Sequence, residues 1–258
     1  MKTLMKVERL KQMEEYISKK EFVTIDELSE KFSVHKNTVR SDVNELAEKG
    51  IIEKKYGGIS YKSYKVPTSF EEREVMHIES KKIIGRLAAS FLKEEDIIYV
   101  DSGTTTSMLF CEPELLPKRL TVITNSLSVI NQCFQKTDYN VYALPGKGDR
   151  QLNSFSSFET IESARAYNIQ KAFLGTRGIS ENGKLSSASL IDTRIKSVIL
   201  ENSQQCILMA EIEKVNHPAM LDFAQLSAFD VWVCDQYTKE IQQLANSSGV
   251  QLVTPDNR

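Results

Sequence analysis

Two apolar stripes with the spacing of α-helices lie close together near the N-terminus. Ile25, Leu28 and Phe32 form the first stripe, at intervals of three and four residues. After a three-residue turn, Val39 and Val43 begin a second stripe along the next helix. Two short amphipathic helices joined in this way are typical of a helix-turn-helix unit.

The segments on either side complete a small domain. An apolar stripe from Leu10 to Ile17 predicts a helix before the pair. The segment 51–59 predicts a β-hairpin with a Gly-Gly turn. We therefore expect a winged helix-turn-helix domain over residues 1–60.

The outward face of the second helix is polar. Asn can bond an adenine edge, Arg a guanine edge, and Ser or Thr a base or a phosphate. Lysines of the hairpin suit phosphate contacts, which position a protein on DNA. Such a face could instead serve protein contacts, but a face without a task more often carries Glu and Lys four residues apart. We expect double-stranded operator DNA as the partner, contacted by His35, Lys36, Asn37, Thr38, Arg40, Ser41, Asn44, Lys54 and Lys55.

The polar segment 61–80 is expected to connect two domains. A helix that restarts at Ser69 carries His77 and Lys81. Over residues 81–258, short apolar runs alternate with helical patterns, and several runs are apolar throughout, as in strands buried on both faces. This pattern predicts an α/β domain with a mostly parallel sheet. The predicted strands are Ile97–Val100, Leu120–Thr124, Val141–Leu144, Ala172–Leu174, Cys206–Met209, Val231–Cys234 and Leu252–Val253.

The segments that follow these strands contain many Gly, hydroxyl, Asn, Lys and Arg residues. In open parallel sheets, ligands bind beyond the carboxyl ends of the strands. Gly103 admits a close approach of the backbone, and the N–H groups of 103–106 open a predicted helix that can hold a phosphate. Asp101 can accept hydrogen bonds from sugar hydroxyls, and Lys or Arg can neutralise charge. These features predict a site for a phosphorylated sugar or polyol, formed by Asp101, Ser102, Gly103, Thr104, Thr105, Thr106, Asn125, Arg150, Arg177 and Lys214.

Each feature of this site also has a simpler interpretation. A Gly-Thr-Thr-Thr loop can be an ordinary turn between a strand and a helix, Asn125 can be a helix cap, and Lys214 can be a solvated loop residue. Their occurrence at successive strand ends favours a binding site.

Charge limits how the chain can bind DNA. Its 258 residues include 33 basic and 35 acidic side chains, a net charge of −2. The first 65 residues carry 14 basic and 11 acidic side chains, so the DNA-binding part is only mildly basic. Affinity must then come from local placement of charge and from a homo-oligomer, a dimer or tetramer, that contacts two half-sites.

The four cysteines, at 111, 133, 206 and 234, have no metal-ligand spacing and no Cys-x-x-Cys pair. The N-terminus has no apolar leader, and no apolar run approaches the roughly 20 residues that span a bilayer. We therefore expect a cytoplasmic protein with no cofactor, no metal and no membrane contact.

Several motifs resemble the DeoR family of bacterial transcription regulators. In the N-terminal part these are Glu8-Arg9-Leu10, Thr38–Val43 and Tyr56-Gly57-Gly58. In the C-terminal part they are Val100–Thr106, Val122–Ser126 and the segment 172–179. The resemblance covers nearly the whole chain. It implies a sensor domain similar to ribose-5-phosphate isomerase, and a repressor of a carbohydrate-utilisation operon that responds to a phosphorylated sugar or polyol.

The chain departs from the family pattern where DNA and ligand would be contacted, so its operator and its ligand need not be the common ones. It has His35 for Ser, Ser41 for Arg, Tyr56 for His, Pro145 for Gly, Arg177 for an acidic residue and Glu211 for Asp.

Two other functions fit the same parts. A sugar-phosphate isomerase with a DNA-binding arm would need a general base near the substrate carbon. The isomerases carry acidic residues in the loop that matches 175–178, where this chain has Thr176 and Arg177. An architectural DNA-binding protein would have no use for the Gly-Thr-Thr-Thr loop. We therefore expect a regulator and not an enzyme.

Overall fold

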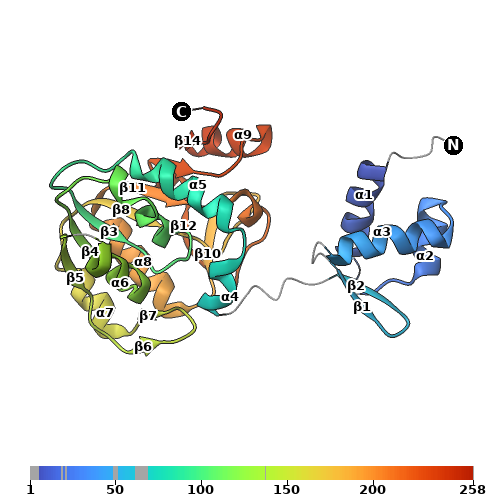
Figure 1. Cartoon of the computed structure of the whole chain (residues 1–258), viewed down its shortest axis with the longest axis horizontal. Coiled ribbons are helices and arrows are strands. Elements are labelled where there is room, and N and C mark those ends of the chain that lie inside the picture. The colour runs from blue at the N-terminus through green and yellow to red at the C-terminus, as the bar shows by residue number, and fades with distance from the viewer. Residues whose placement is uncertain are drawn as a thin grey trace. The chain divides into compact units, whose positions relative to one another are not determined.

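The computed structural model describes residues 6–18, 20, 22–48, 52–61, 69–136 and 138–257 (Figure 1). The chain forms two units, residues 1–68 and residues 69–258. Of the predicted connecting segment 61–80, residues 62–68 lie outside the described residues. None of the helices that the structure describes is both long and apolar enough to cross a membrane.

The N-terminal unit contains the predicted helices and hairpin. Its elements are α1 (Lys6–Ser18), α2 (Ile25–Phe32), α3 (Lys36–Glu48), β1 (Ile52–Lys55) and β2 (Gly58–Tyr61). The apolar stripes meet in one core, where Leu28, Val39 and Ile59 are buried. Thr24 caps α2, because its hydroxyl accepts a hydrogen bond of 3.1 Å from the N–H of Glu27.

The hairpin turn lies one position earlier than predicted. The turn consists of Tyr56 and Gly57, and Gly58 already belongs to β2. Gly57 has a φ of 88°, which a residue without Cβ adopts at little cost. Gly58 serves a different need, because a Cβ there would lie 2.6 Å from the backbone oxygen of Val23. Val23 pairs with Ile59, so the chain before α2 packs directly against the hairpin.

A buried ion pair joins α1 to α3. The guanidinium of Arg9 donates two hydrogen bonds to the carboxylate of Asp42, at 2.7 Å from Nε and 3.1 Å from Nη2. Both side chains are buried, and the hydrogen bond to Asp42 raises the pKa of Arg9. A two-point contact fixes orientation as well as distance, so this pair sets the position of α3 on α1.

Seven parallel strands form the central sheet of the C-terminal unit within the described residues (Figure 1). Their order across the sheet is β14-β13-β11-β8-β3-β4-β5. Each predicted strand is present, with bounds that differ by at most three residues, and the predicted α/β fold is confirmed. The strands are β3 (Ile97–Val100), β4 (Thr121–Thr124), β5 (Asn140–Ala143), β8 (Ile169–Leu174), β11 (Ser203–Met209), β13 (Val231–Val233) and β14 (Gln251–Val253).

Helices cover both faces of this sheet. They are α4 (Phe70–Val75), α5 (Ile78–Ala89), α6 (Leu127–Lys136), α7 (Phe158–Ala164), α8 (Leu190–Glu201) and α9 (Lys239–Ser248), with short 3₁₀ helices η1 (Thr106–Phe110), η2 (Pro113–Leu115), η3 (Ile212–Lys214) and η4 (Leu226–Ala228). One apolar layer includes side chains of α5, η1 and α6 together with Ile98 and Val100. The other includes side chains of α7, α8 and α9 together with Tyr99. Successive residues of β3 thus enter opposite layers, as a strand requires.

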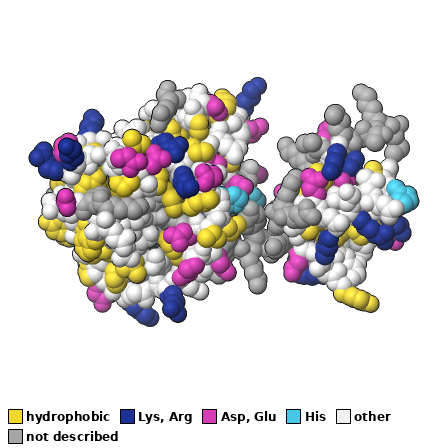
Figure 2. Space-filling model, in the orientation of Figure 1, with side chains coloured by type: hydrophobic (Ala, Val, Ile, Leu, Met, Phe, Trp, Pro, Cys, Tyr) yellow, Lys and Arg dark blue, Asp and Glu magenta, His cyan; other side chains and the backbone are white. Residues whose placement is uncertain are grey.

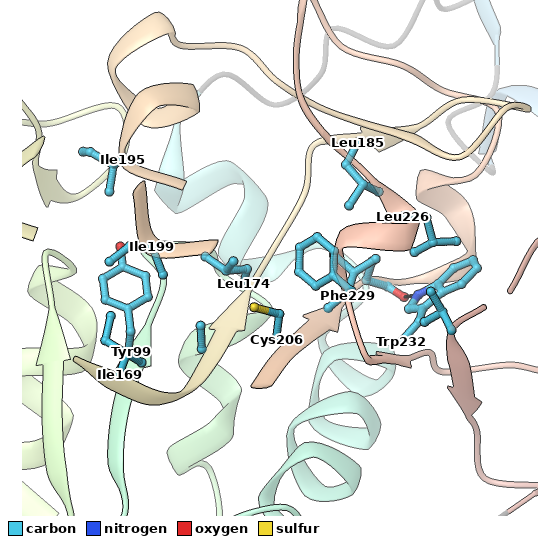
Figure 3. Close-up of a cluster of buried hydrophobic side chains, with 14 of the residues drawn as sticks. Tyr99, Ile169, Leu174, Leu185, Ile195, Ile199, Cys206, Leu226, Phe229 and Trp232 are labelled. Atoms are coloured by element: carbon cyan, nitrogen blue, oxygen red, sulfur yellow. Dashed lines mark hydrogen bonds between the residues drawn. The ribbon is translucent and has the colours of Figure 1, made fainter. Parts of the chain in front are cut away.

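Figure 3 shows the layer that contains Tyr99. Trp232 of β13, Leu174 of β8 and Ile195 of α8 all lie in it. The indole N–H of Trp232 donates a hydrogen bond of 3.1 Å to the backbone oxygen of Ala210, so its polar atom is satisfied inside the core. This layer holds α8 firmly against the sheet.

The sequence pattern does not predict two small antiparallel sheets. One contains β9 (Gly178–Ile179), β10 (Lys184–Ser187) and β12 (Leu221–Gln225), and the other contains β6 (Gly148–Asp149) and β7 (Ser154–Phe155). These strands have two to five residues and mix hydroxyl and charged side chains with apolar ones. No apolar run therefore marks them.

The helix predicted to restart at Ser69 is interrupted and forms α4 and α5. Ser69 and Glu72 form a capping box at the start of α4. The interruption lies at His77, whose backbone is left-handed with a φ of 50°. An uncommon conformation of this kind is kept only where surrounding contacts hold it.

The Arg9–Asp42 pair yields a stability prediction. Asp42→Ala leaves a buried guanidinium without its counter-charge, so we expect the N-terminal unit to lose about 3–5 kcal/mol of unfolding free energy. Urea denaturation of the full chain, followed by circular dichroism, measures this loss.

Two variants control this experiment. Lys6→Ala removes an exposed ion pair with Glu45 on the same two helices and should leave the midpoint unchanged. Arg9→Met combined with Asp42→Leu removes both charges and should recover part of the loss. An unchanged midpoint in Asp42→Ala would contradict the role of the pair.

Candidate functional site

The predicted polar face of α3 is exposed. Asn37, Arg40, Ser41 and Asn44 are exposed along one side of the helix, while Val43 on the other side is buried. The face is therefore available to a partner over about two turns of helix. Figure 2 shows Lys and Arg side chains, with fewer acidic ones, on the surface of the N-terminal unit.

The start of α3 has an unusual cap. His35 Nδ1 accepts a hydrogen bond of 3.3 Å from the N–H of Asn37, in the place where a hydroxyl oxygen would serve. Lys36 lies beside it and pairs with Asp26 of α2 at 2.8 Å. Thr38 is half-buried. His35, Lys36 and Thr38 are thus partly engaged in contacts within the unit.

Side-chain contacts order the polar face. Arg40 Nη1 donates to Asn37 Oδ1 at 3.4 Å, and the ammonium group of Lys54 donates to Asn44 Oδ1. Lys55 is exposed on the same hairpin. A groove of about 610 Å³ lies between the start of α2, α3 and the hairpin; it has apolar side chains such as Val43 and Ile59 and the polar side chains Arg40, Asn44, Lys54 and Lys55.

The C-terminal unit has a topological switch point between β3 and β8. The chain proceeds from β3 to β4 and β5 on one side, and from β8 to β11, β13 and β14 on the other. Ligands of open α/β sheets bind beyond the carboxyl ends of the strands at such a point. Asp101 follows β3 there, and Gly175 follows β8.

Asp101 is the centre of a buried charge network. Its Oδ2 accepts a hydrogen bond of 3.0 Å from the N–H of Gly175 and another from the ammonium group of Lys196. Lys196 lies on α8, 3.7 Å from the carboxylate of Asp192 one turn earlier. Burial acts to lower the pKa of Lys196, but Asp101 and Asp192 outweigh it, and this pKa is raised. Burial raises the pKa of Asp192, which also accepts a hydrogen bond from Ser187.

The loop after β3 offers free backbone donors. The N–H groups of Gly103, Thr104 and Thr105 donate to no acceptor in the part of the chain that the structure describes. The helix that follows is a 3₁₀ helix of five residues, so these N–H groups matter more than a helix dipole. The hydroxyl of Thr106 bonds back to the carbonyls of Asp101 and Gly103 and holds the loop in shape.

Several cations lie around this loop. Lys81, at the start of α5, donates to the backbone oxygens of Arg73 and Met76 at the end of α4. Burial lowers the pKa of Lys81 to about 8; Glu211 acts to raise it, while Lys214 and Arg73 act to lower it. Glu211 in turn accepts a hydrogen bond of 3.1 Å from the hydroxyl of Thr105.

The predicted effector residues differ in their burial and in their hydrogen bonds. Asn125 is buried, and its side chain accepts from the hydroxyl of Tyr99 at 2.9 Å and donates to the backbone oxygen of Phe155 at 3.0 Å. Arg150 is exposed in the turn between β6 and β7. Ser102 is buried next to Asp101. Asn125 therefore ties the end of β4 to β7.

Four charged residues near this site, Arg73, Lys81, Asp192 and Lys196, are not among the residues that the sequence pattern predicts for it. The last two stand four residues apart on the apolar, inward face of α8. A charged pair at that spacing on a buried face was a detectable feature. Among the described residues, no group of His, Cys, Asp and Glu is arranged to hold a metal ion.

Comparison with known proteins agrees with this division into two functional parts. The DeoR-like helix-turn-helix domain matches residues 9–65, and the DeoR C terminal sensor domain matches residues 76–236. The HTH-type transcriptional regulator IolR of Bacillus subtilis is 34% identical over 234 residues, which is 90% of this chain and 92% of that protein. The Glycerol-3-phosphate regulon repressor of Escherichia coli is 28% identical over 221 residues, 86% of this chain and 87% of that one.

Solved structures show a more distant likeness. Ribose 5-phosphate isomerase A from Methanocaldococcus jannaschii gives a TM-score of 0.37 at 15% sequence identity, over 52% of this chain and 53% of that one.

The position of Lys81 yields a prediction about pH. Its pKa is about 8 in the folded chain against 10.5 when unperturbed, in surroundings that include Glu211, Glu74, Lys214 and Arg73. Between these two values the unfolded chain keeps a proton that the folded chain has released. Folding stability therefore rises with pH in that window. Relative to Lys81→Met, the wild type should gain stability from pH 8 to 10.5, as measured by urea midpoints of the C-terminal unit.

Lys82→Met is the matched control. Lys82 is exposed next to Lys81 on α5 and pairs with Glu79. The difference between wild type and Lys82→Met should stay flat over the same pH range. If the stability difference between wild type and Lys81→Met were also independent of pH, the Lys81 ammonium group would not be held in the buried position described.

Proposed function

The chain belongs to the DeoR family of transcription regulators, which are not enzymes, and on that basis we propose that it is a repressor of a carbohydrate-utilisation operon. In this proposal a phosphorylated sugar or polyol releases it from its operator. The observation that carries the proposal is the loop 103–105, whose free N–H groups lie among cations at the switch point of the sheet. The relative from Escherichia coli is itself named a repressor of a glycerol-3-phosphate regulon.

DNA contact is proposed for the exposed face of α3. Arg40 can bond a guanine edge with two N–H groups, and Asn37 or Asn44 can bond an adenine edge. The hairpin lysines, Lys54 and Lys55, face the groove beside α3 and suit phosphate contacts. Contacts from His35, Lys36, Thr38 and Ser41 would complete the surface. A dimer or tetramer would place two such units on the half-sites of one operator.

Effector binding is proposed for the loop after β3. A phosphate there would accept from the N–H groups of 103–105, which resembles an anion-binding nest. Arg177 and Lys214 would supply positive charge, and the carboxylate of Asp101 would accept from a hydroxyl of the sugar or polyol. One oxygen of Asp101 is buried and has no hydrogen-bond partner among the described residues. An acceptor of this kind supports a ligand with hydroxyl groups.

The DNA contact yields a prediction about base preference. Arg40→Ala should weaken binding to the preferred site by about 1–3 kcal/mol and relax the preference at one base position. Lys55→Ala, as the matched control on the hairpin, should weaken binding to all sequences alike and lower the salt slope by about one. Binding to a randomised DNA library at several salt concentrations measures both effects. A base preference profile unchanged in Arg40→Ala would remove α3 as the recognition helix.

The effector loop yields a second prediction. A Cβ at position 103 would lie 3.1 Å from Thr106 Oγ1, so a larger side chain must push the loop from its shape. Gly103→Val should lose release by phosphorylated sugars and polyols and keep operator affinity, as measured by fluorescence anisotropy with a panel of such compounds. Gly148→Ala, where the added Cβ meets no atom within 4 Å, should behave as wild type. Release of Gly103→Val at wild-type ligand concentrations would place the phosphate elsewhere.

A further inference from the structure

Helix α4 brings an arginine to the effector site from the very start of the C-terminal unit. The unit begins at Ser69, which caps α4, and Arg73 follows within the first turn of the helix. Its guanidinium reaches the turn between β6 and β7, where Nη2 donates to the backbone oxygen of Gln151 at 3.4 Å. The side chain thus spans from the entry of the unit to a loop of the predicted effector site.

No carboxylate among the described residues forms an ion pair with Arg73. Its Nε donates to the backbone oxygen of Ser69 at 3.1 Å, and its guanidinium lies 5.7 Å from the ring centre of Phe70. It pairs with no carboxylate in the part of the chain that the structure describes. Lys196 differs in this respect, because Asp101 neutralises it. Three of the five N–H groups of Arg73 therefore lack a protein acceptor.

The surroundings of Arg73 favour an anion. Burial and the nearby charge of Arg177 lower the pKa of Arg73 to about 10, while Asp192, Asp101 and Glu211 act in the opposite direction. A forked donor that is half-buried and repelled by another cation is arranged to bind a phosphate in a bidentate manner.

Contacts around the end of α4 connect it to the rest of the site. Lys81 holds the last carbonyls of α4, as described above, and lies near Glu211, which bonds to Thr105. His77 Nε2, at the break between α4 and α5, lies 2.8 Å from a carboxylate oxygen of Glu213 in η3. The break in the helix is therefore packed against the segment that carries Lys214.

We infer that Arg73 binds the anionic group of the effector directly, so that the ligand fixes α4, the first helix after the DNA-binding unit. This inference rests on the proposed function. It adds α4 as the helix through which ligand binding would affect the segment that leads to the DNA-binding unit. A bound phosphate would supply the acceptors that the guanidinium lacks. The alternative is that Arg73 only clamps the carbonyls of Ser69 and Gln151 together.

The test uses the full chain and inorganic phosphate as the probe. Arg73→Gln should weaken phosphate binding by about 10- to 100-fold, the size of a charge-assisted hydrogen bond, as measured by calorimetry. Without phosphate, this variant should melt at or above the wild-type temperature, because repulsion with Arg177 is relieved. A structural clamp predicts the reverse, a lower melting temperature with unchanged phosphate affinity. Arg86→Gln removes an ion pair between Arg86 of α5 and Glu112, and it should leave phosphate affinity unchanged.

Hydrogen exchange tests the effect on α4. Phosphate should slow exchange of the amides at 70–75 in the wild type and should not do so in Arg73→Gln. Unchanged exchange in the wild type with phosphate bound, or wild-type phosphate affinity in Arg73→Gln, would overturn the inference. If Gly103→Val abolished phosphate binding while Arg73→Gln kept it, only the role of Arg73 would fail. If the wild type bound neither phosphate nor any phosphorylated sugar or polyol, the proposed function would fail with it.

Discussion

A carboxylate cut off from water needs its counter-charge inside the protein, and Asp101 imposes this constraint on the C-terminal unit. Its partners are the N–H of Gly175 and the ammonium group of Lys196. They come from the loop after β8 and from α8, so β3, β8 and α8 must pack with these groups together. The sheet changes direction between the same two strands. The charge that organises the fold therefore also lies where a ligand would bind.

The two units hold their charges in opposite ways. On α3, Arg40 and Asn44 stay exposed and touch only neighbouring side chains, so DNA could replace those contacts at little cost. At the switch point, Asp101, Asp192 and Lys196 are buried and bound to one another. Such a network is rigid and admits a ligand only in a fixed arrangement. Selectivity for DNA then depends on the shape of the bases and on the groups at their edges. Selectivity for the effector depends on charged side chains that are already in position before the ligand binds.

Sequence reasoning succeeded where burial leaves a pattern. Inner strands such as β3 and β13 are buried, so an apolar run such as 97–100 marks them, whereas β5 at the edge of the sheet is largely exposed. The residues after those strands could be predicted for the same reason. The meeting of Lys196 with Asp101 could not, because the two residues are 95 positions apart in the sequence and no periodicity encodes it, although the spacing of Asp192 and Lys196 on α8 was detectable. Asn125 stays a predicted ligand contact, and its place after a strand did not indicate its hydrogen bonds to Tyr99 and Phe155.

The departure at position 177 affects the charge of the effector site. In the family pattern that the chain resembles, an acidic residue stands between Gly175 and Gly178, and at this place it could neutralise Arg73 within the protein. Arg177 instead adds a like charge close enough to lower the pKa of Arg73. Asp192 compensates only in part, because it already faces Lys196. If the ligand binds here as proposed, one with two negative charges, such as a phosphate monoester, would be attracted by Arg73 and Arg177 more strongly than a neutral sugar would.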